Sequence, residues 1–159
     1  DGIDGLAITE VIKTIVIIEL FSSTPTPLVA LGGLTIACLL PLYYFNFRKS
    51  KKVFLGDAGS LFLGTLVMVY LLYVLGPNYQ FKDGYQLNKV LFAVLVVLYP
   101  LVDLLRVFFI RIKNNSSPFT PDKNHIHHFL KNLEWKEKKI ILIIMISEFI
   151  LLLTIFYLQ

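Results

Sequence analysis

Five long apolar stretches, separated by short polar segments, constrain the fold of this chain more than any other feature. A helix needs about 20 mostly apolar residues to cross a bilayer, and only helices and closed barrels satisfy their backbone groups there. The sequence therefore predicts an all-α polytopic membrane protein with about five transmembrane helices, forming a single membrane domain over residues 1–159. The expected spans are residues 6–21, 28–45, 61–75 (with a start as early as Ser60), 90–112 and 140–158.

The composition supports a membrane protein over a water-soluble one. Hydrophobic residues make up 56% of the 159 residues and charged residues only 16%, against about 25% charged residues in ordinary soluble domains. The single cysteine, Cys38, excludes a disulfide within the chain and is expected to be core or lipid-facing. The net charge of +4 lies in loops between apolar runs rather than on a nucleic-acid-binding face, so we expect no nucleic-acid partner.

The distribution of Lys and Arg predicts how the spans are oriented. Basic residues are concentrated in the second and fourth connections, and the positive-inside rule places such loops in the cytoplasm. Segments 1–5, 46–59 and 113–139 are then cytoplasmic, and the C-terminus is extracytoplasmic. Prolines and glycines predict turns at residues 22–27 and 76–78, and Pro100 is expected to kink the fourth span.

The first polar segment is Asp1-Gly2-Ile3-Asp4-Gly5. Its two carboxylates are three residues apart and share a face of a helical turn, while glycines let the backbone approach a ligand. A metal or nucleotide site is one interpretation. A solvated helix start, with acids favoured by the helix dipole, is the other.

The second segment is Phe54-Leu55-Gly56-Asp57-Ala58-Gly59-Ser60, which follows four cations. A carboxylate beside cations at the membrane surface suits Mg²⁺ shared with a phosphate substrate. The alternative makes Asp57 the N-cap of the third helix, and the two roles are compatible. Phe54 has two interpretations, base stacking or membrane anchoring.

The third segment, residues 117–128, ends in His125-Ile126-His127-His128. A zinc site is one interpretation, but no cysteine is nearby and the spacing suits no common zinc finger. Imidazoles can instead donate hydrogen bonds to phosphate or sugar oxygens. A merely solvated loop is the remaining interpretation.

Charged residues also occur inside the spans, where they are costly and usually paired or functional. Asp103 and Arg106 are three residues apart, and we expect them to pair near the inner interface. Glu10 and Lys13 have the same spacing and the same expectation. Glu148 has no evident partner.

Together the three polar segments resemble the motifs of the polyprenyl-phosphate N-acetylhexosamine-1-phosphate transferases, the superfamily that includes phospho-N-acetylmuramoyl-pentapeptide transferase. The resemblance covers essentially the whole chain. The His-Ile-His-His form is similar to the branch that initiates O-antigen (lipopolysaccharide), enterobacterial common antigen and teichoic-acid linkage units in cell-wall biogenesis.

The resemblance implies Mg²⁺-dependent transfer of a sugar-1-phosphate from a UDP-N-acetylhexosamine, most simply UDP-GlcNAc, to undecaprenyl phosphate at the bacterial cytoplasmic (inner) membrane, with release of UMP. Mn²⁺ is an alternative ion, and a homodimer is left open. Asp57 matches the metal ligand. The other implied site residues are Asp1 and Asp4 at the catalytic and nucleotide centre, Phe54 at the uracil, His125, His127 and His128 at the diphosphate or sugar, and Arg111 and Lys123 at phosphate.

The chain also departs from the family pattern. Members have about ten spans, and neither their Asp-Asp pair on an earlier loop nor the Asn-rich stretch before Asp1 is present. The sequence thus looks like the C-terminal half of such a protein, and we expect no transferase activity from these 159 residues alone. The alternative function is a non-catalytic membrane scaffold, or a transporter half that pairs with another subunit.

Overall fold

The computed structural model describes residues 5–48, 50–82, 87–114, 117, 126 and 135–157. Over these residues the chain is helical, and its one β-type pairing is an isolated bridge between Ser22 and Phe81. The all-α prediction is therefore confirmed. The described helices are α1 (Leu6–Phe21), α2 (Val29–Asn46), α3 (Gly56–Leu75), α4 (Lys89–Val96), α5 (Leu98–Lys113) and α7 (Glu137–Tyr157).

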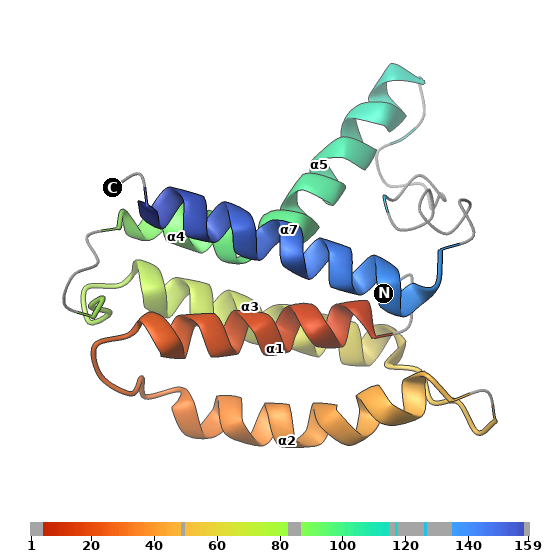
Figure 1. Ribbon diagram of the computed structural model, residues 1–159, viewed down its shortest axis with the longest axis horizontal. Coiled ribbons are helices and arrows are strands. Elements are labelled where there is room, and N and C mark those ends of the chain that lie inside the picture. The colour runs from red at the N-terminus through yellow and green to blue at the C-terminus, as the bar shows by residue number, and fades with distance from the viewer. Residues whose placement is uncertain are drawn as a thin grey trace.

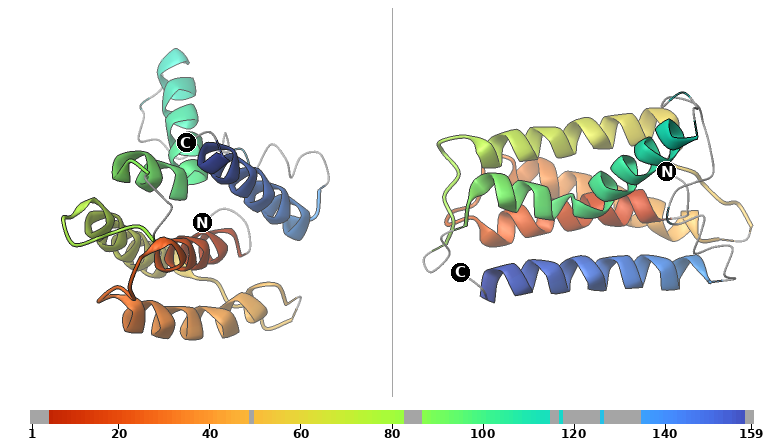
Figure 2. Two further views of the ribbon diagram at one scale, coloured as in Figure 1. Left: turned by 60° about the vertical axis from the view of Figure 1, so that its left-hand side comes forward. Right: turned by 90° about the horizontal axis from the view of Figure 1, so that it is seen from above.

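The helices run back and forth along one long axis (Figure 1). Helix α1 lies between α2 on one side and α4 with α7 on the other, and it also packs along α3 (Figures 1 and 2). Helices α1, α3 and α7 begin, and α2 ends, at the same end of the bundle, which we call the motif end. The α1–α2 and α3–α4 connections and the end of α7 lie at the opposite, far end.

The core forms around α1, and the outer surface of the bundle is apolar. Ile8, Ile15 and Ile18 of α1 are buried together with Tyr70 and Val74 of α3. On the outside, large apolar side chains remain exposed, such as Leu34 at 68% and Leu61 at 72%. A water-soluble protein seldom leaves such continuous apolar surface open, whereas lipid covers it at no cost.

Within the described part of the chain, two helices, α2 and α3, are long and apolar enough to cross a membrane, and the bent pair α4 and α5 makes a third if it counts as one span. Helix α1 has 16 residues, about 24 Å at 1.5 Å per residue, against a hydrocarbon core of about 30 Å. The structure thus supports a membrane protein, while the assignment of α1 and α7 as spans stays a prediction.

The fourth predicted span is bent by 75° between α4 and α5. The break falls at Val97, and Pro100 is the third residue of α5. Proline has no N–H to donate to the carbonyl of Val96, and its ring clashes with that carbonyl in a continuous helix. The predicted kink is confirmed, three residues before the proline that causes it.

Two helices begin earlier than the apolar stretches do. Helix α3 starts at Gly56 rather than near Ser60, and α7 starts at Glu137 rather than at Ile140. Polar residues continue a helix beyond the membrane at no cost, so an apolar run marks the lipid-facing part of a helix and not its whole length.

Both predicted turns at the far end are present, and hydrogen bonds join them. The Ser23 N–H donates to the Gln80 carbonyl at 2.9 Å, and the Lys82 N–H donates to the Phe21 carbonyl at 3.0 Å. The buried Tyr79 hydroxyl donates to the Ile18 carbonyl at 2.9 Å. Burial raises the pKa of Tyr79 above its ordinary value, so this hydroxyl stays a hydrogen-bond donor.

Candidate active site at the motif end of the bundle

Gly5, the last residue of the first motif, fixes the entry into α1. Its φ of 78° is left-handed, a conformation that costs other residues free energy. A Cβ on Gly5 would also lie 2.5 Å from the Phe47 ring and 2.8 Å from the Tyr43 ring. Glycine therefore lets the first motif approach the end of α2 more closely than any other residue would.

A small apolar cluster around Leu6 joins that entry to α7 and α5. Leu6 is buried with Ile140, Ile141 and Ile144 of α7, and Tyr99 of α5 packs against them. Residues at the edge of the same cluster are Phe47, Trp135 and Met145. The Lys138 Nζ lies 5.2 Å from the centre of the Phe47 ring, a cation–π distance that adds a second link between α2 and α7. The helix that follows the histidine segment is thus packed on the first motif.

The second motif is held by Asn46, the last residue of α2. Asn46 is buried, and its Nδ2 donates to the Val53 carbonyl at 2.8 Å. The Val53 N–H donates to the Phe45 carbonyl at 3.4 Å. These contacts close the connection between α2 and α3 on itself, so Phe54 and Asp57 return to the motif end.

Phe54 and Asp57 are both accessible. Phe54 is 67% exposed, and the Lys52 Nζ lies 5.0 Å from the centre of its ring. Asp57 is exposed in the first turn of α3, where the helix dipole favours a carboxylate. The alternative interpretation of Asp57 as the N-cap is wrong: Leu55 occupies that position, and no described side chain caps this helix. Because Asp57 does not cap the helix, its carboxylate oxygens are not committed to backbone N–H groups of the first turn.

The third motif is described at Ile126, and there it contacts α5. The Ile126 N–H donates to Oδ1 of Asp103 at 2.8 Å. Asp103 is 6% exposed and lies in the second turn of α5. Arg111, a predicted phosphate contact, is half-buried in the last turn of α5. The pairing of Asp103 with Arg106 stays a prediction.

The remaining predicted site residues fall outside the described part of the chain. Among the residues that the structure does describe, no group of three or more His, Cys, Asp or Glu side chains could hold a metal ion. Of the predicted site residues that the structure describes, Asp57 is the one with a carboxylate, and carboxylate oxygens are the ligands that Mg²⁺ prefers. The predicted site residues outside the described ranges are Asp1, Asp4, Lys123, His125, His127 and His128.

Deeper in the bundle, Lys13 joins two carboxylates. Its Nζ lies 2.6 Å from Oε2 of Glu10 and 2.6 Å from Oε2 of Glu148. The Tyr99 N–H donates to Oε1 of Glu148 at 2.9 Å. The predicted pairing of Glu10 with Lys13 is confirmed, and Glu148 has partners from α1 and from the start of α5. We call Glu10, Lys13 and Glu148 the charged triad.

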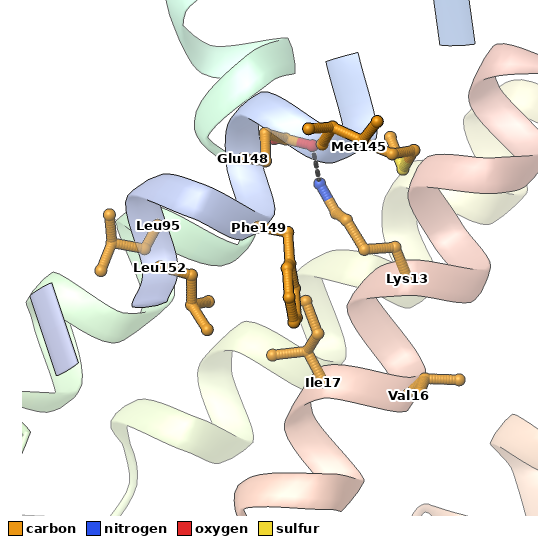
Figure 3. Close-up of a pocket in the computed structure, with 9 residues that line it drawn as sticks. Lys13, Val16, Ile17, Leu95, Met145, Glu148, Phe149 and Leu152 are labelled. Carbon is orange, nitrogen blue, oxygen red and sulfur yellow. Dashed lines mark hydrogen bonds and ion pairs between the residues drawn. The ribbon is translucent and has the colours of Figure 1, made fainter. Parts of the chain in front are cut away.

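A cavity of about 370 Å³ opens beside the charged triad. Figure 3 shows Lys13 reaching across it to Glu148, with Phe149 and Leu152 of α7 facing Ile17 of α1. Apart from Lys13 and Glu148, every described side chain that lines it is apolar. This cavity is chemically unlike the motif end, because the two charges among its described lining residues are already paired with each other.

Two polar residues in these contacts were not expected to shape the site. Asn46 and Asp103 each accept or donate one hydrogen bond that fixes a motif segment. Asn46 directly follows an apolar run, and that position was a usable signal, whereas Asp103 lies inside the run 90–112, where a charged residue itself indicates a partner. Glu148 gave no signal of which residue it contacts, because Lys13 lies 135 residues away in the sequence.

Comparison with known proteins agrees with the motifs. Residues 1–75 match the family described as glycosyl transferase family 4. An undecaprenyl-phosphate alpha-N-acetylglucosaminyl 1-phosphate transferase of Pasteurella multocida is 34% identical over 60% of this chain and 26% of its own length. The resemblance to the polyprenyl-phosphate transferases is thereby confirmed. A protein of the same name from Yersinia pestis is 29% identical over 95% of this chain and 41% of its own length.

A third relative extends the similarity to another polyprenyl lipid. The decaprenyl-phosphate N-acetylglucosaminephosphotransferase of Mycobacterium tuberculosis is 32% identical over 91% of this chain and 39% of its own length. The chain thus spans between about a quarter and two-fifths of the length of these relatives. No solved structure matches the chain.

Proposed function

We propose that this chain forms the C-terminal part of a membrane enzyme that transfers N-acetylhexosamine-1-phosphate from a UDP-sugar to undecaprenyl phosphate. UDP-GlcNAc is the proposed donor, because the relatives are named for transfer of N-acetylglucosamine 1-phosphate. The products are UMP and a lipid-linked sugar that initiates a cell-surface polysaccharide. The 159 residues alone are expected to be inactive, because the relatives are more than twice as long.

One observation carries this proposal: parts of three motifs that are distant in sequence gather at one end of the bundle. Gly5 packs on the end of α2, Asn46 folds the Phe54–Asp57 segment back to that end, and Ile126 is bonded to α5. A reaction at the membrane surface needs polar segments that meet outside the lipid. Motifs with no shared function would have no reason to lie at the same end of the bundle.

The chemistry needs positioning and charge stabilisation more than covalent help from the protein. An oxygen of the acceptor phosphate attacks the β-phosphorus of the UDP-sugar and forms a new P–O bond. The bond from that phosphorus to the bridging oxygen breaks, and UMP leaves with the electron pair. Lys51 and Lys52 of the α2–α3 connection are exposed, and their positive charge would attract the negative diphosphate to the motif end.

Asp57 is the residue that would hold a divalent cation. Its carboxylate is exposed in the first turn of α3, close in sequence to Lys52 and Phe54. Bound Mg²⁺ supplies a Lewis acid for the diphosphate. Asp57 would then hold the cation at the start of α3, where it can contact the diphosphate while Phe54 stacks on the uracil.

The proposed orientation puts the motif end in the cytoplasm, where UDP-sugars are made available, and the far end outside. The basic residues of the α2–α3 connection and of the segment before α7 favour this orientation. In bacteria this corresponds to the cytoplasmic membrane. The apolar exterior of α2 and α3 favours a location of the protein in the bilayer. The hydrocarbon chain of the acceptor would lie in the same bilayer.

A transporter half would draw support from the charged triad, since ionisable groups within spans often line a path. The contacts favour a different role for it. Lys13 is bonded to both carboxylates, and the second oxygen of Glu148 accepts the Tyr99 N–H, so the triad fastens α1 to α7 and α5. The predicted site residues Phe54 and Asp57, by contrast, are exposed at the motif end.

Release of UMP tests the proposal. The full-length parent, in detergent with Mg²⁺ and undecaprenyl phosphate, is assayed against a panel of UDP-sugars. We expect release with UDP-GlcNAc and none when the lipid phosphate is omitted. Release from the 159-residue chain alone would contradict the expected inactivity, and co-expression with a matching N-terminal half is expected to restore turnover.

A further inference from the structure

Asp103 is a buried acid that accepts a hydrogen bond from a segment 23 residues further along the chain. It lies on α5, and its Oδ1 accepts the Ile126 N–H at 2.8 Å. With 6% of its surface exposed, the carboxylate has lost most of its water. A charged group in that position is costly unless hydrogen bonds replace the water, so the bond to Ile126 is part of what keeps it there.

Ile126 stands between His125 and His127 in the third motif. Its amide nitrogen belongs to a planar peptide unit that also contains the Cα of the preceding residue. An acceptor that fixes this N–H therefore restrains the peptide unit that links His125 to Ile126, one peptide unit before His127. A hydrogen bond to an ionised acceptor is shorter and stronger than one between neutral groups, which suits this role.

The base of α5 is itself well anchored. Tyr99 lies one helical turn before Asp103, its N–H donates to Glu148 of α7, and its ring packs in the Leu6 cluster. Asp103 thus stands on a turn of helix that is fastened to α7 and to the first motif. A continuous line of contacts runs from Leu6 through Tyr99 and the α5 backbone to Asp103 and Ile126.

We propose that Asp103 is a positioning residue that anchors the third motif to α5 by binding the Ile126 N–H. This role rests on the proposed function only for its catalytic consequence, because the hydrogen bond itself can be measured without turnover. Asp103 contacts the backbone of the motif, so it acts through the histidines and is not assigned a contact with substrate.

Hydrogen exchange of the Ile126 amide in the full-length protein tests the contact. We expect this amide to be protected in the unsubstituted protein and to exchange at least about tenfold faster in Asp103→Ala. In Asp103→Asn a side-chain oxygen remains as acceptor, so most of the protection is expected to stay. Protection of the α3 backbone around Tyr70 reports whether each variant is folded.

Kinetics of the same variants test the consequence. For Asp103→Ala we expect kcat/KM for the UDP-sugar to fall by about a hundredfold or more, and for Asp103→Asn by tenfold or less. The matched control is Asn88→Ala, which also removes a side-chain acceptor of backbone N–H groups, at the start of α4. It is expected to leave kcat/KM within twofold, while Asp57→Asn lowers turnover more than a hundredfold with Ile126 still protected.

The outcomes separate this role from the proposed function. Unchanged exchange at Ile126 in a folded Asp103→Ala variant would overturn the proposal whatever the activity. Lost protection of the Ile126 amide with unchanged kcat/KM would overturn it too, because the contact would then position no group that the reaction needs. Asp103-dependent protection in a protein that turns over no UDP-sugar would refute the transferase but support the anchoring of the segment by Asp103.

Discussion

Replacing Lys13 by leucine removes the ammonium that lies between the two carboxylates of the charged triad. Its Nζ is 2.6 Å from an oxygen of Glu10 and 2.6 Å from an oxygen of Glu148. Those two oxygens are therefore no more than about 5 Å apart. The lysine side chain is 12% exposed and the glutamates 12% and 6%, so water screens them little.

The size of the effect follows from these distances. Two unit charges about 5 Å apart repel by about 3 kcal/mol at an effective dielectric constant of about 20. Removing one partner of a buried ion pair costs about 3–5 kcal/mol in general. We therefore expect Lys13→Leu to lower the free energy of unfolding by about 3–5 kcal/mol, which corresponds to a fall in Tm on the order of 10 °C.

Thermal unfolding of the full-length protein in detergent measures this loss. Glu10→Gln leaves Lys13 paired with Glu148 and keeps an amide oxygen that can accept from the Lys13 ammonium, so it is expected to change stability by about 1 kcal/mol. Adding Glu10→Leu to Lys13→Leu removes the repulsion, so the double variant is expected to recover about 3 kcal/mol. Lys82→Leu is the control, because this exposed side chain lies at the far end and should matter by about 0.5 kcal/mol at most.

A Tm for Lys13→Leu within about 2 °C of the unsubstituted protein would refute the reasoning, because a loss of about 3 kcal/mol in the free energy of unfolding lowers Tm by more than that. A double variant less stable than Lys13→Leu alone would contradict the electrostatic cause. It would indicate that Glu10 stabilises the bundle by packing or by a partner other than Lys13.

Three further substitutions test the motif end. Asp57→Asn in the full-length parent is expected to lower turnover more than a hundredfold and to weaken the Mg²⁺ dependence, and an unchanged Mg²⁺ titration would remove Asp57 from the metal. Gly5→Ala combines a left-handed φ of 78° with a Cβ 2.5 Å from Phe47, so unfolding measurements should show a loss of about 1–3 kcal/mol that Phe47→Leu partly restores. Asn46→Ala leaves the Val53 carbonyl unpaired; we expect a loss of about 1–3 kcal/mol and a raised KM for the UDP-sugar, and an unchanged KM would argue against a positioning role.

Local signals in the sequence were enough for much of the helical framework. The bounds of α1, Leu6–Phe21, follow the first apolar stretch residue for residue, because a proline-rich turn limits it on one side and a glycine on the other. The turns at residues 22–27 and 76–78 and the bend before Pro100 depend on proline and glycine chemistry, which is local. Helix α3 was predicted too short because its apolar stretch begins only near Ser60, while the polar first turn of the helix begins at Gly56.

The contacts that shape the site depend on tertiary structure, and composition does not report them. Glu148 meets Lys13 across 135 residues, and Asp103 meets Ile126 across 23. Spacing along one helix identified Glu10 and Lys13 as neighbours, but it has no information on a third partner from α7. The roles of the three motifs came from resemblance, and the geometry adds which residues hold two of them in place.

The most direct test of the central claim is UMP release by the full-length parent, in detergent with Mg²⁺ and undecaprenyl phosphate, across a panel of UDP-sugars. The account predicts release with one N-acetylhexosamine donor, abolished when the lipid phosphate is left out and reduced more than a hundredfold in Asp57→Asn. Well-folded protein that releases no UMP with any donor would contradict it, and would leave the motif end as the polar face of a non-catalytic membrane partner.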